Sequence, residues 1–328
     1  MKISICVSIH NMEKTLRMCL DSLLGQTLAD KEIILVNNGS TDNSQAIIDE
    51  YCANHSEIKA FVQEDRGLAQ GRKSGVDNAS GEYIGFVDAD DCVEPEMFET
   101  MVAVAQGENA QIVECRIDAK GKFVTDYPIG TFETKQVLYE YFLNKSFYPM
   151  LWFRIYHRSL FEQPIFPELY TNNEDEFVFP CLLYRAEKLV RIPNVFYHYT
   201  VDNVNSVMQA YKTNDRAVLE RRKVVIKCAE HVKNVIGSET IDSRFYEVYQ
   251  SYLLTIAKVI LFGHYKFLGV QERLDIIEEI MGLTEKRINY IARNYNIKKC
   301  YENTIIRLIG IRAAIWCFRI KRKLLRDK

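Results

Sequence analysis

The chain has 328 residues, of which 48% are apolar and 26% are charged. Such a chain can bury a sizeable core, which excludes an intrinsically disordered protein and predicts one large domain, alone or with a helical annex. The 42 basic and 44 acidic residues nearly balance, so we expect no nucleic acid as a partner.

The cysteines and the first residues indicate where the protein works. Nine cysteines are scattered without a CxxC pair, which predicts reduced, mostly buried thiols in the cytoplasm. The first residues follow a strand pattern and not that of a signal peptide, so we do not expect export. No window contains about eighteen consecutive apolar residues, so a membrane-spanning helix is not expected.

The N-terminal third alternates between two patterns. Short β-rich apolar runs are separated by segments whose apolar residues recur at helical spacing. The expected strands are 3–9, 32–36, 58–62 and 83–87, and the expected helices are 15–24, 43–51 and 68–79. This alternation with short connections predicts an α/β fold, in which helices cover both faces of a parallel sheet.

Polar residues follow each expected strand, where such sheets bind ligands. These polar turns are residues 10–11, 37–40, 64–67 and 88–91. Neither a GxGxxG motif nor a GxxxxGK[ST] motif is present, so hydride transfer and P-loop phosphoryl transfer lose their main support. A diphosphate would therefore have to be bound in another way, and a divalent cation is the obvious candidate.

The last of these turns is acidic. It places Asp88, Asp90 and Asp91 directly after an apolar strand. Carboxylates this close repel one another unless a cation, water or a hydrogen-bond donor offsets the repulsion, and hard oxygen ligands suit Mg²⁺ or Mn²⁺. The alternative is that Asp90 or Asp91 caps a helix starting near Pro95.

Four blocks in this order, residues 7–11, 35–44, 65–75 and 81–91, resemble the family 2 inverting glycosyltransferases. The resemblance implies a Rossmann-like nucleotide-diphospho-sugar transferase fold, called the A-type glycosyltransferase fold, with a helical C-terminal extension. It implies a transferase domain over residues 1–210, divided into a nucleotide-sugar half (1–116) and an acceptor half (117–210). Residues 211–328 would form the helical region.

The resemblance also assigns roles to residues. The first two turns would surround the base and ribose, Arg72 would lie near the diphosphate, and the acidic pair would meet ribose and metal. The implied donor-binding residues are His10, Asn11, Glu13, Asn37, Asn38, Gly67, Arg72, Asp88, Ala89 and Asp90. The implied ligands of Mn²⁺ or Mg²⁺ are Asp88, Asp90 and His198.

Two positions depart from the family pattern. The family often has Pro-x-Tyr-Asn where this chain has residues 8–11, and an acidic pair where Asn37 and Asn38 stand. Asn offers an amide NH₂ beside its carbonyl oxygen, and that oxygen could still accept a hydrogen bond from a uracil N3–H. We therefore expect a UDP-sugar as donor.

The strict alternation stops beyond Arg116. We expect a helix over 134–143, a strand over 151–156, and a helix that opens in the acidic segment 172–177 and runs to 183. That segment resembles the family's Glu-Asp motif, which implies that Asp175 is the catalytic base. The alternative is that these acids only favour a helix N-terminus, worth up to about 1 kcal/mol each. His198 could approach the metal, or be a hydrogen-bonded structural residue.

The closing segment, residues 302–328, carries eight basic residues against two acidic ones, interleaved with aliphatic and aromatic side chains. A basic amphipathic helix of this kind binds anionic lipid, although it could also dock on the protein body. We therefore expect peripheral association with the inner face of the cell membrane.

The resemblance, together with these observations, implies an inverting hexosyltransferase-type enzyme. It would move a sugar from a nucleotide donor to a glycan or lipid-linked glycan hydroxyl, in synthesis of an envelope polysaccharide such as capsule or lipopolysaccharide. One alternative is a nucleotidyltransferase, which normally has a basic Gly-rich loop after the first strand. The other is a catalytically silent nucleotide-sugar-binding or membrane-associated module.

Overall fold

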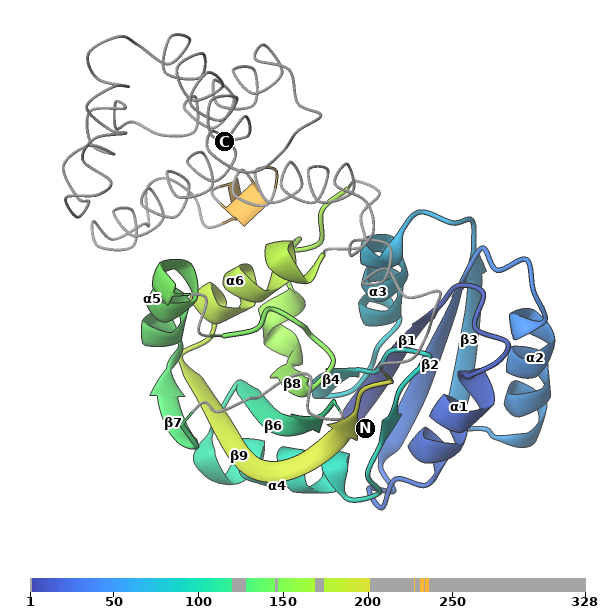
Figure 1. The fold of residues 1–328 in the computed structure, drawn as a ribbon, viewed down its shortest axis with the longest axis horizontal. Helices are drawn as coiled ribbons and strands as arrows, with labels where there is room; N and C mark the ends of the chain where they lie inside the picture. Colours follow the sequence, from blue (N-terminus) through green and yellow to red (C-terminus); the bar gives the residue numbers. More distant parts are fainter. Residues whose placement is uncertain are drawn as a thin grey trace, which may run out of the picture. The chain divides into compact units, whose positions relative to one another are not determined.

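The computed structural model describes residues 2–119, 128–144, 147–168 and 174–200, together with residues 227, 231, 232, 234 and 235. The chain divides into two compact units, one formed by residues 1–209 with 231–238 and the other by residues 210–230 with 239–328. Nearly all of the described residues belong to the first unit, and most of its helices and strands are labelled in Figure 1.

The first part of this unit alternates strands and helices, as predicted. Its strands are β1 (Ile3–Ile9), β2 (Lys31–Asn38), β3 (Ile58–Gln63) and β4 (Tyr83–Phe86), and its helices are α1 (Leu16–Leu24), α2 (Ser44–Asn54) and α3 (Leu68–Asp77). β1 and β2 are buried along almost their whole length, as is typical of strands covered on both faces. One face of α1 is buried at three- and four-residue spacing, through Leu16, Cys19, Leu20 and Leu23.

These four strands are parallel, in the order β3-β2-β1-β4, which confirms the predicted parallel sheet. The last residue of β1, Ile9, lies opposite Asn37 of β2, and Asn37 lies opposite Val62 of β3. The strands therefore end at one edge of the sheet. The polar turns that follow them are brought together at this edge.

The second part of the unit is mixed. Its elements are β5 (Cys92–Val93), α4 (Met97–Glu108), β6 (Ile112–Asp118), β7 (Gly130–Glu133), α5 (Thr134–Asn144), β8 (Arg154–His157), the 3₁₀ helix η1 (Arg158–Phe161), α6 (Asp175–Arg185) and β9 (Lys188–His198). α5 and α6 match two predicted helices, and β8 begins three residues later than the strand expected over 151–156. No strand was predicted from the sequence at β6 or β9.

One sheet joins the two parts. β8 pairs antiparallel with both β4 and β6, β6 pairs parallel with β9, and β5 and β7 pair antiparallel with β9. Cys92 in β5 lies opposite His198 in β9. Because β5 directly follows the acidic turn, this pairing brings the end of β9 beside that turn.

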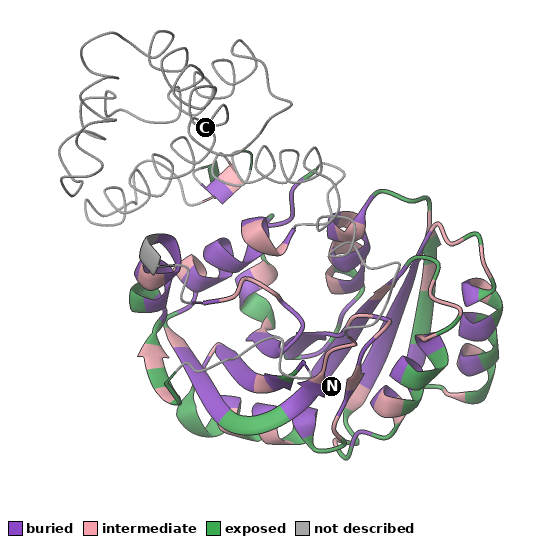
Figure 2. Cartoon of the chain, in the orientation of Figure 1, coloured by how far each residue is buried: buried purple, intermediate pink, exposed green. Residues whose placement is uncertain are grey.

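The helices cover the sheet on both faces, and the strands form the buried centre (Figures 1 and 2). α3 lies on one face of the β1–β3 part and α1 with α2 on the other (Figure 1). α4 packs against β6, β8 and β9, and α5 packs against α6. α3 can lie directly on β1 because residue 71 is glycine; a Cβ there would overlap the Ser8 side chain.

Among the described residues, no helix combines the length and the apolar character needed to cross a membrane. The predicted helical region, residues 211–328, lies outside the described residues apart from five positions between 227 and 235. The basic tail at 302–328 lies wholly outside them.

Candidate active site

Hydrogen bonds join the turns after β1 and β2. His10 Nδ1 lies 2.9 Å from the backbone oxygen of Asn38. Asn11 has a left-handed backbone with φ of 55°, its Oδ1 accepts from the Thr41 backbone N–H at 2.8 Å, and its own N–H donates to Ser40 Oγ at 3.1 Å. The structure thus makes neighbours of the residues predicted to surround the base and ribose.

Asn37 and Asn38, the last two residues of β2, are buried, with 3% and 2% of their surface exposed. Asn37 Nδ2 donates to Gln45 Oε1 at 2.6 Å, and its Oδ1 accepts from a backbone N–H of the same turn. Asn38 Nδ2 donates to Asp65 Oδ1 at 3.1 Å, and its Oδ1 accepts from Gln63 Nε2 at 2.7 Å. Asn38 could therefore bind a base only by exchanging one of these bonds.

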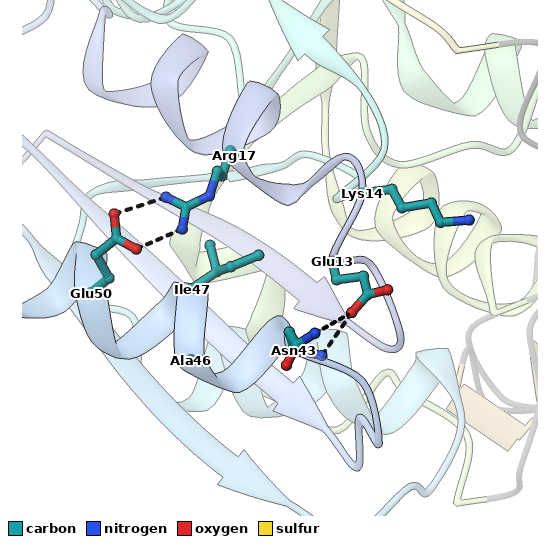
Figure 3. A pocket seen from close by; sticks show the side chains of 7 residues that line it. All are labelled: Glu13, Lys14, Arg17, Asn43, Ala46, Ile47 and Glu50. Atoms are coloured by element: carbon teal, nitrogen blue, oxygen red, sulfur yellow. Dashed lines mark hydrogen bonds and ion pairs between the residues drawn. The ribbon is translucent and has the colours of Figure 1, made fainter.

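Glu13 and Gly67 shape neighbouring turns. Glu13 Oε2 accepts from the backbone N and the Nδ2 of Asn43 at 3.0 and 2.9 Å, so its side chain faces the start of α2. It borders a hollow of about 430 Å³ whose other lining residues are Lys14, Arg17, Asn43, Ala46, Ile47 and Glu50 (Figure 3). Gly67 precedes α3 with φ of 80°, and its N–H donates to Asp65 Oδ1 at 3.0 Å.

The acidic turn after β4 divides its carboxylates between two environments. Asp88 has 27% of its side chain exposed, and Asp90 is also partly accessible. Asp91 is fully buried, and this burial, together with the charges of Asp88 and Asp90, raises the pKa of Asp91 well above its usual range. α4 begins at Met97 and has Glu96 at its N-cap, so the interpretation of the turn as a simple helix cap is wrong.

Asp91 anchors the end of β9 to the turn. Its Oδ2 accepts from the Tyr197 hydroxyl at 2.8 Å, and its Oδ1 accepts from the Thr200 backbone N–H at 2.7 Å. The same Tyr197 oxygen accepts from the Asp88 backbone N–H at 3.1 Å. Ala89, between the carboxylates, is 2% exposed. Asp91 is therefore a buried residue that holds the acidic turn against the end of β9.

Arg72, on α3, joins the acidic turn to the start of α6. It is 4% exposed, its Nη2 donates to Asp88 Oδ1 at 2.5 Å, and its Nη1 donates to Glu174 Oε1. Glu174 is 1% exposed, and its Oε2 has no hydrogen-bond partner within the described parts of the chain. The Phe86 ring lies 5.8 Å from the guanidinium carbon. A single buried guanidinium thus binds two carboxylates that are far apart in the sequence.

Asp175 is the first residue of α6 and follows Glu174 directly. Burial, and then the negative charges of Glu174 and Glu176, raises the pKa of Asp175 to about 8, while Arg72 acts in the opposite direction. Its Oδ1 accepts from the Glu176 backbone N–H at 2.9 Å. A carboxyl with a pKa near neutrality is suited to accept a proton from a hydroxyl. Its neighbour's bond to Arg72 brings it beside the acidic turn.

His198 has other partners. Its Nε2 lies 2.6 Å from Glu94 Oε1 and its Nδ1 lies 3.6 Å from Asp118 Oδ2. Within the described ranges, no three His, Cys, Asp or Glu side chains converge as they would around a metal ion. The structure therefore does not bring His198 together with Asp88 and Asp90.

The sequence reasoning missed two residues that organise this site. The Glu-Asp resemblance implies a role for Asp175 alone, whereas the preceding Glu174 is buried against Arg72, 102 positions away. Tyr197 bonds both Asp91 and the Asp88 backbone across more than a hundred positions. No local pattern reports such pairings, although an acid and a tyrosine beside predicted site residues are a weak signal.

Comparison with known proteins identifies the kind of domain. Residues 4–170 match the sequence model of the family described as Glycosyl transferase family 2. EpsH of Bacillus subtilis (strain 168), which is named as a glycosyltransferase, is 31% identical over 223 residues, covering 64% of this chain and 63% of EpsH. The match thus spans less than two thirds of that relative's length.

Solved structures share the fold. Residues 1–349 of TarS from S. aureus, in complex with UDP-GlcNAc, align with a TM-score of 0.71 and 16% identity, covering 98% of this chain and 92% of that one. The mannosyltransferase PcManGT from Pyrobaculum calidifontis, in complex with GDP-Man and Mn²⁺, aligns with a TM-score of 0.55 and 12% identity. The alignment covers 100% of this chain and 88% of PcManGT. The predicted A-type fold is confirmed.

Proposed function

The chain belongs to glycosyl transferase family 2, and from this premise we propose that it transfers a sugar from a UDP-sugar to a hydroxyl of a glycan or lipid-linked glycan. The transferase domain spans residues 1–210, with the nucleotide-sugar half at 1–116 and the acceptor half at 117–210. The proposal assigns residues 211–328, which lie almost wholly outside the described residues, to a separate helical region. UDP is supported by the TarS complex, although the GDP-Man complex shows that this fold also accepts another base.

One observation carries the proposal. Arg72 binds both Asp88 and Glu174, so the predicted base, Asp175, stands beside the predicted donor turn. Donor binding and proton removal require groups from distant parts of the chain, and this contact brings those parts together. A carboxyl with a raised pKa beside a cluster of carboxylates is also the arrangement expected at a functional site.

The residues at the acidic turn fit a divalent cation. Asp88 and Asp90 are partly accessible carboxylates that would supply two hard oxygen ligands, leaving the other positions for diphosphate oxygens and water. Bound Mn²⁺ or Mg²⁺ would neutralise charge on the leaving diphosphate. For His198 to join them, it would have to leave Glu94 and Asp118.

The chemistry is a single displacement that inverts the anomeric centre. The acceptor oxygen bonds to the anomeric carbon from the face opposite the diphosphate, and Asp175 accepts the proton of that hydroxyl. The bond from the anomeric carbon to the diphosphate oxygen breaks, and the nucleoside diphosphate leaves with its electron pair. Burial of Asp175 favours this step because it makes the carboxylate a stronger base.

A donor panel tests this function. The full chain is incubated with Mn²⁺ and a series of UDP-, GDP- and dTDP-sugars, and released nucleoside diphosphate is measured. We expect turnover with at least one UDP-sugar. A separate incubation contains a nucleoside triphosphate and a sugar phosphate, and release of pyrophosphate there would instead identify a nucleotidyltransferase. Binding of nucleotide sugars without turnover would identify a catalytically silent module.

The role of the acidic turn has its own test. Asp90→Asn removes one carboxylate charge from the turn, so Mn²⁺-supported UDP binding should weaken strongly. Calorimetry measures UDP affinity with and without Mn²⁺ in the wild type and in the variant. Equal affinity under all four conditions would refute the metal assignment.

We further propose that the enzyme binds the inner face of the cell membrane, where envelope polysaccharides such as capsule or lipopolysaccharide are assembled. The support is the basic segment 302–328, in which each basic residue near an anionic surface contributes about 1 kcal/mol. Replacing Lys321, Arg322 and Lys323 by Gln should release the full chain from anionic vesicles while sparing donor turnover. Unchanged sedimentation with the vesicles would indicate a helix docked on protein.

A further inference from the structure

Arg72 lies where three segments meet that are far apart in the sequence. It belongs to α3, its partner Asp88 follows β4, and its partner Glu174 precedes α6, 102 positions along the chain. α3 itself lies directly against β1, since Gly71 leaves room for Ser8. The backbone that carries the guanidinium is therefore firmly placed.

The surroundings of Arg72 disfavour direct contact with a diphosphate. The side chain is 4% exposed, and each Nη atom already donates to a carboxylate. A planar guanidinium holding two carboxylates fixes their relative geometry, as a point charge such as an ammonium would not. Because the side chain is buried, a phosphate could reach its remaining N–H groups only if the surrounding residues moved.

The charges around Arg72 are unequal. Asp88, Glu174 and, next to it, Asp175 share this one cation, and Glu174 keeps a buried oxygen without a hydrogen-bond partner among the described residues. If Glu174 lost its charge, Arg72 would turn toward the remaining carboxylates. The charge on Glu174 therefore determines how strongly Arg72 attracts Asp88 of the donor turn and Asp175, the predicted base.

We propose that Arg72 and Glu174 form a buried clasp that sets Asp88 in position relative to Asp175, so that Arg72 acts as a positioning residue and not as a diphosphate ligand. The clasp rests on the proposed function, which makes Asp88 a donor ligand and Asp175 the base. A purely structural ion pair would instead stabilise α6 without influencing the donor turn.

A double-mutant cycle on the full chain separates these roles. Glu174→Gln, Asp88→Asn and the double variant are compared for UDP affinity in the presence of Mn²⁺, by calorimetry, and for kcat and KM of transfer. Glu176→Gln is the matched control, because this carboxylate stands two positions along the same helix start and accepts from the Tyr141 hydroxyl instead.

The clasp predicts a loss that depends on Asp88. Glu174→Gln should weaken UDP binding and lower kcat by about tenfold each, within the range of coupling between neighbouring groups. In the Asp88→Asn background the same change should have no further effect on UDP affinity. Glu176→Gln should leave UDP affinity unchanged.

Two results would overturn the clasp: independent, additive losses in the cycle, or a Glu174→Gln variant of lower stability with wild-type affinity and kcat. If Glu174→Gln does not fold, Arg72→Lys enters the same cycle, since it keeps the charge but loses the two-armed geometry. A wild-type protein that neither binds UDP nor transfers sugar would overturn the proposed function itself, which the cycle alone cannot do.

Discussion

Two buried charge clusters in this domain, one beside the edge of the sheet and one within the sheet, have opposite compositions. At the edge, a single cation, Arg72, is shared by Asp88 and Glu174. Within the second part of the sheet, a single anion, Glu114 of β6, is shared by Arg154 of β8 and Arg191 of β9, each at 2.5 Å. All three residues of this inner cluster are 1% exposed or less.

The two clusters differ in how their surplus charge is offset. Arg154 also donates to the backbone oxygens of Met150 and Tyr148, and the rings of Phe153 and Phe179 lie 4.0 and 4.1 Å from its guanidinium carbon. The surplus at the Arg72 cluster is negative, and Glu174 Oε2 has no hydrogen-bond partner in the described chain. The positive surplus of the inner cluster is thus offset by backbone oxygens and aromatic rings, whereas the negative surplus at the edge suits a cation and a substrate. Substitutions in the inner cluster should lower the free energy of unfolding, and substitutions in the edge cluster should lower the transfer activity.

The largest effect on activity is expected at Asp175. Asp175→Asn keeps the shape of the side chain but cannot accept the proton, so transfer should fall about a hundredfold to ten-thousandfold. Donor and metal binding should change little, which calorimetry with UDP and Mn²⁺ can check. Glu176→Gln serves as the control at the same helix start. Near-normal transfer by Asp175→Asn would remove the base assignment.

The inner cluster should show the converse behaviour. Glu114→Gln leaves two buried guanidinium groups without their carboxylate, which should lower the free energy of unfolding by about 3–5 kcal/mol. Urea titration measures this loss, and Glu133→Gln, at an exposed position on β7, is the control. At temperatures where the variant stays folded, kcat should be retained. A stable variant with low kcat would contradict the division between the clusters.

The pH dependence of transfer and of stability tests the role of Asp175 beside the edge cluster. The pKa of Asp175 is raised from 3.8 to about 8, so kcat/KM for transfer should rise with pH up to about 8 as the base loses its proton. Between these two values the folded state binds more protons at Asp175 than the unfolded state does, so this group makes stability fall as pH rises. Asp175→Asn should abolish the rise in kcat/KM and reduce the fall in stability, to which the raised pKa of Asp91 also contributes. A transfer rate that is flat from about pH 6 to pH 9 would contradict general-base catalysis by this residue.

The smallest effect is expected where a charge pair is exposed. Arg17 and Glu50 form a two-bond ion pair across the hollow between α1 and α2, at 2.8 and 2.6 Å (Figure 3). Both side chains are about half exposed, at 50% and 52%, and water and salt screen such pairs. Glu50→Gln should therefore leave the thermal unfolding midpoint and donor turnover essentially unchanged. A marked loss of donor turnover would show that this hollow contributes to the active site, and a marked loss of the unfolding midpoint would show that the ion pair stabilises the fold.

The sequence by itself determined the first part of the fold. β1 was predicted with its observed bounds, and β2 to β4 and their helices within a few residues, because apolar periodicity is a local property of the chain. The polar turns could be placed at one edge for the same reason, since parallel strands all end there. The candidate donor residues followed from these turns and from the family resemblance.

In the second part, only the tertiary structure decided β6 and β9, whereas α5, α6 and most of β8 were predicted. β9 (Lys188–His198) contains Arg191 and Pro193, and its sequence does not look like that of a buried strand. Arg191 can be buried because Glu114 of β6 neutralises it, and that pairing forms only when the sheet is assembled. The same is true of Arg72 and Glu174: each looks like a surface charge in the sequence, and a contact across 102 positions makes them part of one site. Long-range electrostatic pairing leaves no periodic trace in a sequence, because it depends on which strands and helices become neighbours.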